Sequence, residues 1–377
     1  MPGRLMPGAV CFVSAAHPPE DVRVVIKEAA SLAAVGYVVS HLAPAARAAC
    51  WSAHGITITT YVRRPGLTGR LLALPALARR AARSGARVLH ANEPDAWLAA
   101  LIAARRTGAR VVLDVHEHYP STFAALHVPH AVAGPAARAV ARFIRWATAR
   151  ADATVVAKDG LEAECRGRVL AARNYALLAT APRPGPRPAV EAPVLVHAGA
   201  MTRARGWPVL LEALARMRAP ARLWLIGRFT DGSEAAFHER VAALGLPDRV
   251  RIDPWMPHAV MMAELSHADI GVVLFQPGLA NHTHALPHKL FDAMAAGLPV
   301  IAPSHAPEVA AAVAESGAGL VVDAADATAV ARALDELAAD PALRARLGMA
   351  GRAAVERRYC WEREAEGLVA LYRDLMS

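Results

Sequence analysis

Short apolar runs that alternate with longer helical patterns constrain the fold of this chain more than any other feature. The runs are rich in Val, Ile and Leu. We expect strands near residues 9–14, 37–42, 56–61, 87–90, 110–115, 153–157, 169–173, 194–198, 222–226, 249–252, 270–275, 298–302 and 319–322. Strands that alternate with helices build parallel sheets that are covered on both faces. The sequence therefore predicts an α/β protein.

A Pro-rich segment divides the chain of 377 residues. Residues 181–193 contain five prolines, which favour an extended connector. Because a chain of this length suits two domains, we expect an N-terminal Rossmann-like domain over 1–182 and a C-terminal one over 190–357, with a last helix within 358–377. Ligands of open parallel sheets bind beyond the carboxyl ends of the strands. The cleft between the two domains is therefore the expected site.

The positive charge lies in the first half of the chain. Residues 1–187 have 24 Lys and Arg against 11 Asp and Glu, whereas the remaining residues have 18 against 22. Arg138, Arg142 and Arg145 would share one face of a helix. This pattern favours a helix packed on the sheet, and it leaves open a peripheral contact with an anionic membrane. Nucleic acid is not an expected partner, because no basic and aromatic reading module is present.

The sequence predicts a cytoplasmic protein. No apolar run approaches the roughly 20 residues of a membrane-spanning helix. The first apolar run, near residue 9, is followed directly by a helical pattern and a second strand, so we interpret it as a strand and not as a signal sequence. The four cysteines are far apart and lack the spacing of a metal site, which favours reduced thiols.

Residues 281–302 form the most informative segment for function. A proline precedes a helical pattern that carries Lys289 and Asp292, and Gly297 ends it before an apolar strand. Lys289 and Asp292 fall in one polar arc, with the apolar side chains opposite. The free N–H groups of such a helix start, together with Lys289, can hold a phosphate, and Asp292 can bind ribose hydroxyls.

A second candidate for phosphate binding follows the predicted strand 194–198. Gly199 and Gly206 flank a turn that contains Arg203 and Arg205, just before a helical pattern. Two guanidinium groups before a helix start suit a diphosphate. The alternative for Arg203 is a solvated loop arginine.

These segments together resemble the donor site of retaining glycosyltransferases of family 4, in which a Pro, a Lys, an acidic residue and the string "AMAxGxPVIA" follow in this order. The resemblance implies the GT-B fold, with two Rossmann-like domains facing each other across a cleft and a C-terminal helix that returns to the N-terminal domain. It also implies Arg205 and Lys289 as catalytic residues that bind the phosphates. The donor-binding residues that it implies are Gly199, Arg203, Arg205, Gly206, Gly227, His284, Lys289, Leu290 and Asp292.

The segment departs from the family at two positions. Many members have two glutamates separated by seven residues, and His284 and Asp292 stand there in this chain. Asp292 is shorter by one methylene, about 1.5 Å. His284 could hydrogen-bond a sugar hydroxyl, or it could belong with His282 and His288 to a solvated cluster. A zinc site is not expected from these three histidines.

The N-terminal half supplies the expected acceptor side. His116 and Glu117 follow the predicted strand 110–115, where their side chains would reach the site. The family has a histidine at this strand end near the reacting sugar, so the resemblance implies a catalytic role for His116. The alternative is a His–Glu capping pair in a loop. Asp21 and Arg23 precede a helix in the first loop and are the other acceptor-side candidates, although Asp21 could act only as an N-cap.

The resemblance implies a retaining, metal-independent hexosyltransferase. Its donor would be a UDP- or GDP-sugar, with no cofactor, and its acceptor a hydroxyl of a glycan, a lipid-linked glycan or a small molecule. The biosynthesis of a polysaccharide, a glycolipid or a glycosylated metabolite would be its setting, in the cytoplasm or at the inner face of the cytoplasmic membrane. Two alternatives stay open: a sugar-nucleotide epimerase of the same shape, and a protein that binds a glycan or nucleotide without catalysis.

Overall fold

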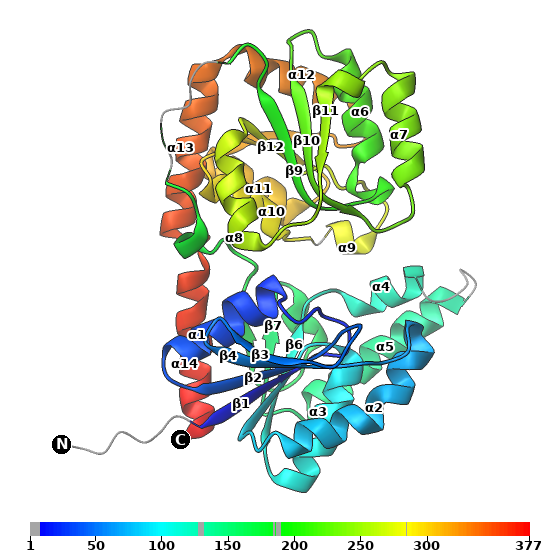
Figure 1. The fold of residues 1–377 in the computed structure, drawn as a ribbon, viewed down its shortest axis with the longest axis vertical. Coiled ribbons are helices and arrows are strands. Elements are labelled where there is room, and N and C mark those ends of the chain that lie inside the picture. The colour runs from blue at the N-terminus through cyan, green and yellow to red at the C-terminus, as the bar shows by residue number, and fades with distance from the viewer. Residues whose placement is uncertain (1–7, 127–131, 184, 186–189, 284) are drawn as a thin grey trace, which may run out of the picture. The chain divides into compact units, whose positions relative to one another are not determined.

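The chain folds into two compact units (Figure 1). The computed structural model describes residues 8–126, 132–183, 185, 190–283 and 285–377. The N-terminal unit contains the chain up to Asn174 together with Glu362–Ser377, and the C-terminal unit contains Tyr175–Trp361. No helix in the described ranges is both long enough and apolar enough to cross a membrane.

The N-terminal unit is built on an eight-stranded sheet of order β3-β4-β2-β1-β5-β6-β7-β8. Its strands are β1 (Ala9–Val13), β2 (Val38–Pro44), β3 (Cys50–Ala53), β4 (Ile56–Tyr61), β5 (Val88–Ala91), β6 (Arg110–Val115), β7 (Ala153–Val156) and β8 (Val169–Ala171). All neighbouring strands are parallel except β3 and β4.

The strand β3 is the one strand of this sheet that the apolar runs do not predict. It joins β4 through the two-residue turn His54–Gly55, where both φ angles are positive, at 52° and 76°. Such turns connect antiparallel strands tightly. Its four residues, Cys-Trp-Ser-Ala, are exposed or half-buried. An edge strand with this composition has no apolar run for sequence reasoning to detect.

Helices cover both faces of the N-terminal sheet. They are the π-helical turn Val22–Ala29, which continues into α1 (Ala30–Ala34), then α2 (Gly66–Arg83), α3 (Pro94–Thr107), α4 (Tyr119–Leu126), α5 (Ala133–Thr148), the 3-10 turn Leu161–Glu164 and α14 (Trp361–Met376). Buried side chains of α2, α3 and α5 share one core with alternate residues of the central strands. On the opposite face, His90 of β5 contacts Tyr372 of α14.

The C-terminal unit has a six-stranded, fully parallel sheet of order β11-β10-β9-β12-β13-β14. The strands are β9 (Val194–Met201), β10 (Arg222–Phe229), β11 (Val250–Asp253), β12 (Ile270–Val272), β13 (Val300–Pro303) and β14 (Gly319–Val322). The alternation of short apolar runs with helical patterns therefore predicted this sheet correctly, because parallel strands are buried on both faces.

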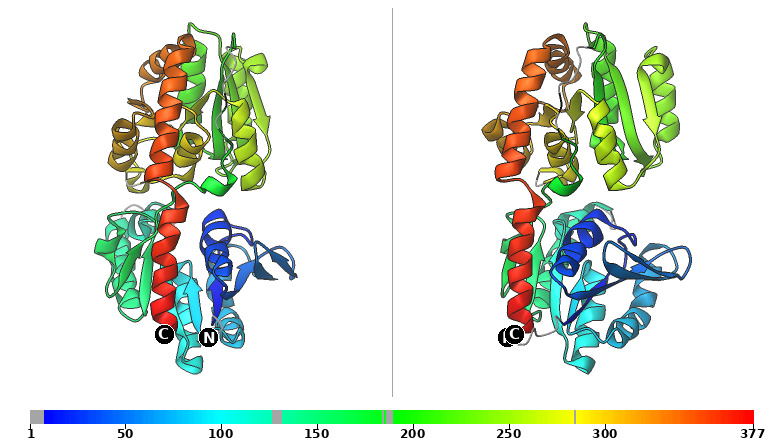
Figure 2. Two further views of the ribbon diagram at one scale, coloured as in Figure 1. Left: turned by 90° about the vertical axis from the view of Figure 1, so that its left-hand side faces the viewer. Right: turned by 60° about the vertical axis from the view of Figure 1, so that its left-hand side comes forward.

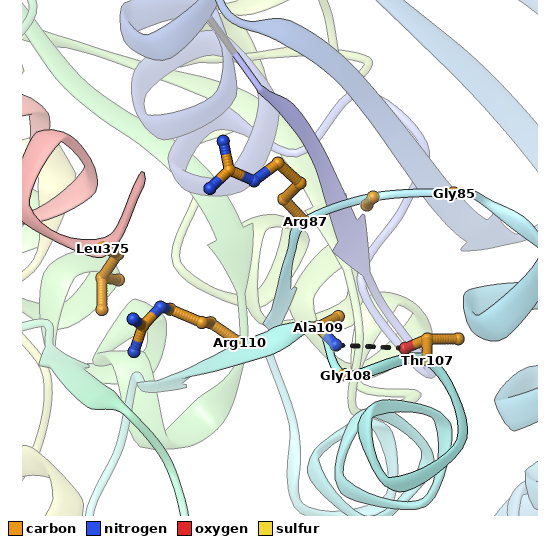
Figure 3. Close-up of a pocket in the computed structure, with 8 residues that line it drawn as sticks. Gly85, Arg87, Thr107, Gly108, Ala109, Arg110 and Leu375 are labelled. Carbon is orange, nitrogen blue, oxygen red and sulfur yellow. Dashed lines mark hydrogen bonds between the residues drawn. The ribbon is translucent and has the colours of Figure 1, made fainter. Parts of the chain in front are cut away.

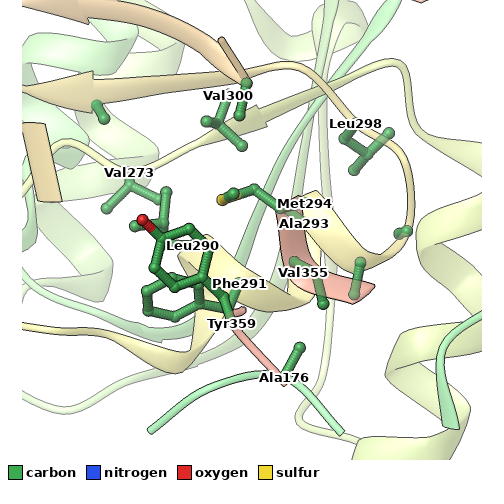
Figure 4. Close-up of a cluster of buried hydrophobic side chains, with 14 of the residues drawn as sticks. Ala176, Val273, Leu290, Phe291, Ala293, Met294, Leu298, Val300, Val355 and Tyr359 are labelled. Atoms are coloured by element: carbon green, nitrogen blue, oxygen red, sulfur yellow. The ribbon is translucent and has the colours of Figure 1, made fainter. Parts of the chain in front are cut away.

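Two hydrophobic cores lie in the C-terminal unit. The helices are α6 (Trp207–Arg216), α7 (Glu234–Ala243), α8 (His258–Glu264), α9 (Ala280–Thr283), α10 (His288–Ala295), α11 (Pro307–Ser316), α12 (Ala327–Ala339) and α13 (Pro341–Arg357), with short 3-10 turns at Leu178–Thr180, Arg203–Arg205, Pro247–Arg249 and Leu265–His267. Figure 4 shows one core, in which Leu290 and Phe291 of α10 lie near Val273, Val300 and Tyr359. This packing fixes α10 at the end of β9 and β12.

The chain changes unit earlier than the sequence predicts. The first crossing lies between Asn174 and Tyr175, before the boundary expected at 182 and the Pro-rich segment 181–193. The physical reason is Tyr175, whose ring contacts Phe291 and Tyr359 at centroid distances of 4.9 and 5.2 Å. This aromatic packing attaches the segment before the prolines to the C-terminal core.

The last helix returns to the N-terminal unit, as the resemblance implies. The unit boundary lies between Trp361 and Glu362, at the start of α14. Figure 2 shows α14 lying along the N-terminal sheet. The Tyr372 hydroxyl lies 2.7 Å from Nδ1 of His90, and the Tyr372 ring also contacts Tyr37.

Candidate functional site

Polar side chains gather at the carboxyl ends of strands in both units. In the C-terminal unit, Lys289 in the first turn of α10 approaches the end of β9. Its Nζ donates a hydrogen bond of 2.9 Å to Nε2 of His197, a buried residue of β9. Burial and the charge of Lys289 hold the pKa of His197 well below its ordinary value. His197 is therefore neutral and can accept this bond, which fixes the direction of the lysine side chain.

A second cation acts on this lysine. Burial lowers the pKa of Lys289 well below its ordinary value, and the positive charge of Arg205 lowers it further. The same Arg205 charge also contributes to the lowered pKa values of His197 and His282, after burial. When two cations lower each other's pKa in this way, a bound anion stabilises their charged forms. The charges of Arg205 and Lys289 thus interact, and their shared phosphate site stays a prediction.

The three predicted glycines all have a positive φ, and Gly199 adjoins Lys289. Gly199 has φ of +111°, and a Cβ placed there would lie 3.8 Å from Cε of Lys289. Gly227, its partner in the β9–β10 register, leaves no room for a side chain, because a Cβ would lie 2.0 Å from the Gly199 carbonyl oxygen. At Gly206, with φ of +89°, a Cβ would meet the carbonyl oxygen of Leu274. The structure thus gives a physical reason for each predicted glycine.

The loop arginine Arg203 is oriented by its neighbours. Its backbone N–H donates to Asp231 at 2.8 Å, and its guanidinium stacks over the ring of Trp207 at 5.0 Å from the centroid. Arg205 ends the same 3-10 turn, and its backbone N–H donates to the hydroxyl of Thr202, which caps the turn.

The expected positions of Asp292 and Leu290 need correction. Asp292 is not displayed at the surface: it is 3% exposed, and His258 donates to its Oδ2 at 3.3 Å. The side chain of Leu290 lies in the hydrophobic core, and its N–H donates to the carbonyl of Pro287. The physical reason is that α10 packs Leu290 into the core and turns Asp292 toward His258 of α8. His284 lies outside the described residues.

In the N-terminal unit, His116 follows β6 and lies close to a buried carboxylate. Its Nε2 lies 2.8 Å from Oδ2 of Asp114, the penultimate residue of that strand. Glu117 is half-buried, and its Oε2 accepts from the Thr122 hydroxyl at 3.3 Å. Asp114 thus orients the ring of His116. The arrangement differs from the expected alternative, because the partner of His116 is Asp114 and not Glu117.

The prediction that Arg23 faces an acceptor is wrong. Its guanidinium is 2% exposed and holds Asp114 in a bidentate pair, with N–O distances of 3.0 and 2.9 Å. It also lies 3.0 Å from Glu28 and donates to the carbonyl of Ala172. Arg23 therefore supports the carboxylate that contacts His116, and the negative charge of Asp114 compensates the burial of the Arg23 charge.

Asp21 caps the helix that begins at Val22 and contains Arg23. Its Oδ1 accepts from the N–H groups of Arg23 and Val24, as expected of an N-cap. Its Oδ2 accepts from Nδ1 of His17 at 3.1 Å. One carboxylate therefore joins the helix start to the loop after β1.

His17 is a functional candidate that sequence reasoning missed. Its ring lies over that of His116 with a centroid distance of 4.6 Å. Burial alone would lower the pKa of His17, but the hydrogen bond to Asp21 and the charges of Glu93, Asp21 and Asp114 raise it to about 9. His17 is therefore protonated at neutral pH, beside the candidate catalytic histidine.

Glu93 organises the loop that carries His17. Its carboxylate accepts from the N–H groups of Ala15, Ala16 and His17 at 2.7 to 2.9 Å. The sequence gives a weak signal for this residue, since Asn92 and Glu93 are polar and directly follow β5. The carboxylate that follows the neighbouring strand therefore shapes this loop.

A buried acidic cluster lies behind His116. Among the residues described, Glu28, His90 and Asp114 form one group whose ligand atoms are close enough to hold a metal ion. Arg23 already contacts both carboxyl groups, at 3.0 and 2.9 Å. Burial and the charge of Asp114 raise the pKa of Glu28 well above its ordinary value although Arg23 opposes this. The cluster thus fits a protein cation and a neutral Glu28 better than a metal.

A surface hollow lies at the amino ends of the strands of the N-terminal sheet, opposite the candidate site (Figure 3). Arg87 and Arg110 line it, and they stand at the amino ends of β5 and β6. His116 follows the carboxyl end of β6. The hollow is therefore separate from the candidate site, and its position does not fit ligand binding in open parallel sheets.

Known families match both units. Residues 22–181 match the glycosyl transferase 4-like domain, and residues 192–340 match the model described as glycosyl transferases group 1. The chain belongs to the group 1 glycosyltransferases. The two matches together cover most of the sequence and correspond to the two units of the structure.

Individual relatives and solved structures agree with this family. The lipopolysaccharide core biosynthesis glycosyltransferase LpsE of Rhizobium meliloti (strain 1021) is 31% identical over 163 residues, which are 43% of this chain and 44% of LpsE. The match thus spans less than half the length of this curated relative.

Two solved structures cover nearly the whole chain. Sucrose-phosphate synthase from Thermosynechococcus elongatus has a TM-score of 0.75 at 21% identity and covers 98% of this chain and 99% of that one. Anabaena HepE in complex with UDP and glucose has a TM-score of 0.74 at 14% identity and covers 97% and 100%. These similarities show the GT-B fold.

Proposed function

We propose that this chain transfers a hexosyl-type sugar from a nucleotide diphosphate sugar to a hydroxyl acceptor, with retention of the anomeric configuration and without a metal. The observation that carries the proposal is the pairing of Lys289 with neutral His197 beside Arg205 and a glycine-lined strand end. Membership of the group 1 family supports the reaction class.

Lys289 and Arg205 would bind the diphosphate of the donor. When the bond between the sugar and the diphosphate breaks, negative charge develops on the leaving phosphate. Two fixed cations would stabilise that charge more in the transition state than in the ground state, which lowers the barrier. His197 would hold Lys289 in place without adding or removing charge.

The donor nucleotide is proposed to be a UDP- or GDP-sugar, with no other cofactor. The binding of UDP and glucose by HepE supports a nucleotide sugar of this kind. Asp292 could reach a ribose hydroxyl only through a shift of the His258 pair, since its carboxylate is buried. We therefore assign the first contacts of the nucleotide to the backbone at Gly199 and Gly227 rather than to Asp292.

The N-terminal unit is proposed to hold the acceptor. His116 and Glu117 would contact its hydroxyl groups, and Asp114 would keep the His116 ring in one orientation. The role of LpsE in lipopolysaccharide core biosynthesis supports a glycan acceptor. A lipid-linked glycan and a small hydroxylated molecule are the other acceptors of this class.

A product assay tests the proposal. The purified chain is incubated with UDP- or GDP-sugars, with and without a lipopolysaccharide core oligosaccharide, and the products are identified by mass spectrometry. We expect a glycosylated acceptor and a free nucleoside diphosphate, with retained configuration by NMR. An isomerised sugar nucleotide in the absence of acceptor would instead indicate an epimerase, and binding without turnover would indicate a non-catalytic protein.

A further inference from the structure

The outer surface of three helices in the N-terminal unit has a composition that packing does not explain. The inner sides of α2, α3 and α5 share one core with the sheet. The basic helices therefore pack on the sheet, as expected. This packing does not explain the residues on their outward sides. We call these outward sides of α2, α3 and α5 the basic face (Figure 1).

The charge of the basic face is almost purely positive. The three helices contain nine arginines and a single carboxylate, Asp95. Asp95 is 8% exposed and forms a bidentate pair with Arg70, so it does not face solvent. Chain segment 29–92, which includes α2, has eight arginines and no Asp or Glu at all. A surface that only had to stay in solution would carry both signs.

Large apolar side chains stand exposed on the same face. On α2, Leu71 and Leu72 are 55% and 70% exposed. Arg79 and Arg80 continue the exposed stripe of this helix toward its end. On α5, Trp146 is 39% exposed and lies under the guanidinium of Arg150, with 4.6 Å between Cζ and the ring centroid.

The helix α5 also combines exposed arginines with an exposed apolar side chain. Arg138, Arg142 and Trp146 are spaced by four residues and are all exposed, so they point the same way. Guanidinium groups bind phosphates in a fork geometry, and Leu and Trp enter the boundary between lipid headgroups and acyl chains. Nucleic acid would explain the arginines but not two adjacent exposed leucines.

We propose that the basic face binds the surface of an anionic lipid bilayer. The arginines contact headgroup phosphates, and Leu71, Leu72 and Trp146 insert at the level of the headgroups. Each arginine near an anionic membrane strengthens binding about fivefold. This contact requires neither donor nor acceptor, so it holds or fails independently of the proposed transferase reaction.

Vesicle flotation with the full chain tests the proposal. The probes are vesicles of phosphatidylcholine alone and of phosphatidylcholine with phosphatidylglycerol. We expect binding to the anionic vesicles only. Removal of three charges in Arg79→Gln, Arg80→Gln and Arg83→Gln together should weaken it about a hundredfold. The double change Leu71→Ser and Leu72→Ser should weaken it at least about tenfold.

Matched variants in the C-terminal unit control for net charge and hydropathy. Arg222→Gln, Arg332→Gln and Arg346→Gln together remove the same charge from exposed sites, and Met349→Ser removes an exposed apolar side chain. Both controls should bind like the unmodified chain. Circular dichroism melting of every variant confirms that it is folded.

Three results would overturn the proposal. One is equal binding to neutral and anionic vesicles. Another is unchanged vesicle binding by the folded arginine and leucine variants of the basic face. The third is binding to duplex DNA that matches the vesicle affinity and does not depend on Leu71 and Leu72, which would identify the face as a nucleic-acid surface.

Discussion

A single histidine shows how neighbouring charges set the properties of a residue in this site. His17 is half-buried and would be neutral by burial alone, yet Asp21 and Glu93 keep it charged with a pKa of about 9. The ring of His17 lies against the ring of His116, and Asp114 of β6 contacts His116. The charge of His17 therefore depends on carboxylates from two different segments of the chain.

The titration of His17 predicts a pH dependence of stability. The folded pKa of about 9 exceeds the ordinary value of 6.5, so protonation stabilises the native state. This contribution is complete below pH 6.5 and is lost as the pH rises through 9, and its full size is roughly 3 kcal/mol. Urea unfolding of the unmodified chain should show this decline relative to His17→Gln.

The exposed His238→Gln variant is the control for that measurement. It should keep the same decline in unfolding free energy between pH 6.5 and 9. Parallel curves for the unmodified chain and His17→Gln over this range would contradict the charged state of His17.

Residue roles could be predicted only where one local pattern contains all the information. Lys289 and Arg205 are predicted from a helix start and a glycine turn, and the charge of Arg205 lowers the pKa of Lys289, while their roles stay predictions. Arg23 and Asp292 also stand in suitable local patterns, but Asp114 and His258 bury them from distant segments. A single sequence does not reveal such partners.

At the scale of elements, the β9–β10 pair determines the geometry beside Lys289. The two strands run in register, with Gly227 opposite Gly199. Apolar runs were sufficient to predict both strands, because a parallel strand must be apolar on two faces. They could not predict β3, whose residues are exposed at an edge.

Replacement of Gly227 by alanine should destabilise the C-terminal unit. The new Cβ would lie 2.0 Å from the Gly199 carbonyl oxygen, so the two strands must separate. We expect the free energy of unfolding to fall by about 3 kcal/mol. Chemical denaturation measures it.

The matched control is Gly278→Ala. Gly278 also has a positive φ, of 98°, but no atom lies within 4 Å of the added Cβ. This variant should lose only about 1 kcal/mol from backbone strain. Equal losses for Gly227→Ala and Gly278→Ala would show that the close approach of β9 and β10 is not the cause.

At the scale of the whole molecule, the two units are joined by chain crossings that sequence composition locates only in part. The prolines at 181–193 indicate a connector between the units. The aromatic packing of Tyr175 nevertheless places the first crossing of the chain from the N-terminal to the C-terminal unit before them. The return of α14 could be inferred only from the family resemblance. Its attachment to the N-terminal sheet depends on Tyr372 and on His90 from β5.

Removal of one hydroxyl should weaken the attachment of α14. In Tyr372→Phe, Nδ1 of the buried His90 loses its contact at 2.7 Å, which should cost about 1–3 kcal/mol of unfolding free energy. Tyr37→Phe removes the hydroxyl of a half-buried ring that contacts the Tyr372 ring, and it should change stability by less than about 0.5 kcal/mol. Indistinguishable melting of both variants would contradict this role of Tyr372.

The central claim is that Lys289 and Arg205 together stabilise the leaving diphosphate of a nucleotide sugar. The most direct measurement is the rate of sugar transfer by Lys289→Ala and Arg205→Ala, with His238→Ala as an exposed control in the same unit. We predict losses of about a hundredfold or more in kcat for the two site variants, with unchanged melting, and none for the control. Full transfer activity in both folded site variants would contradict the claim.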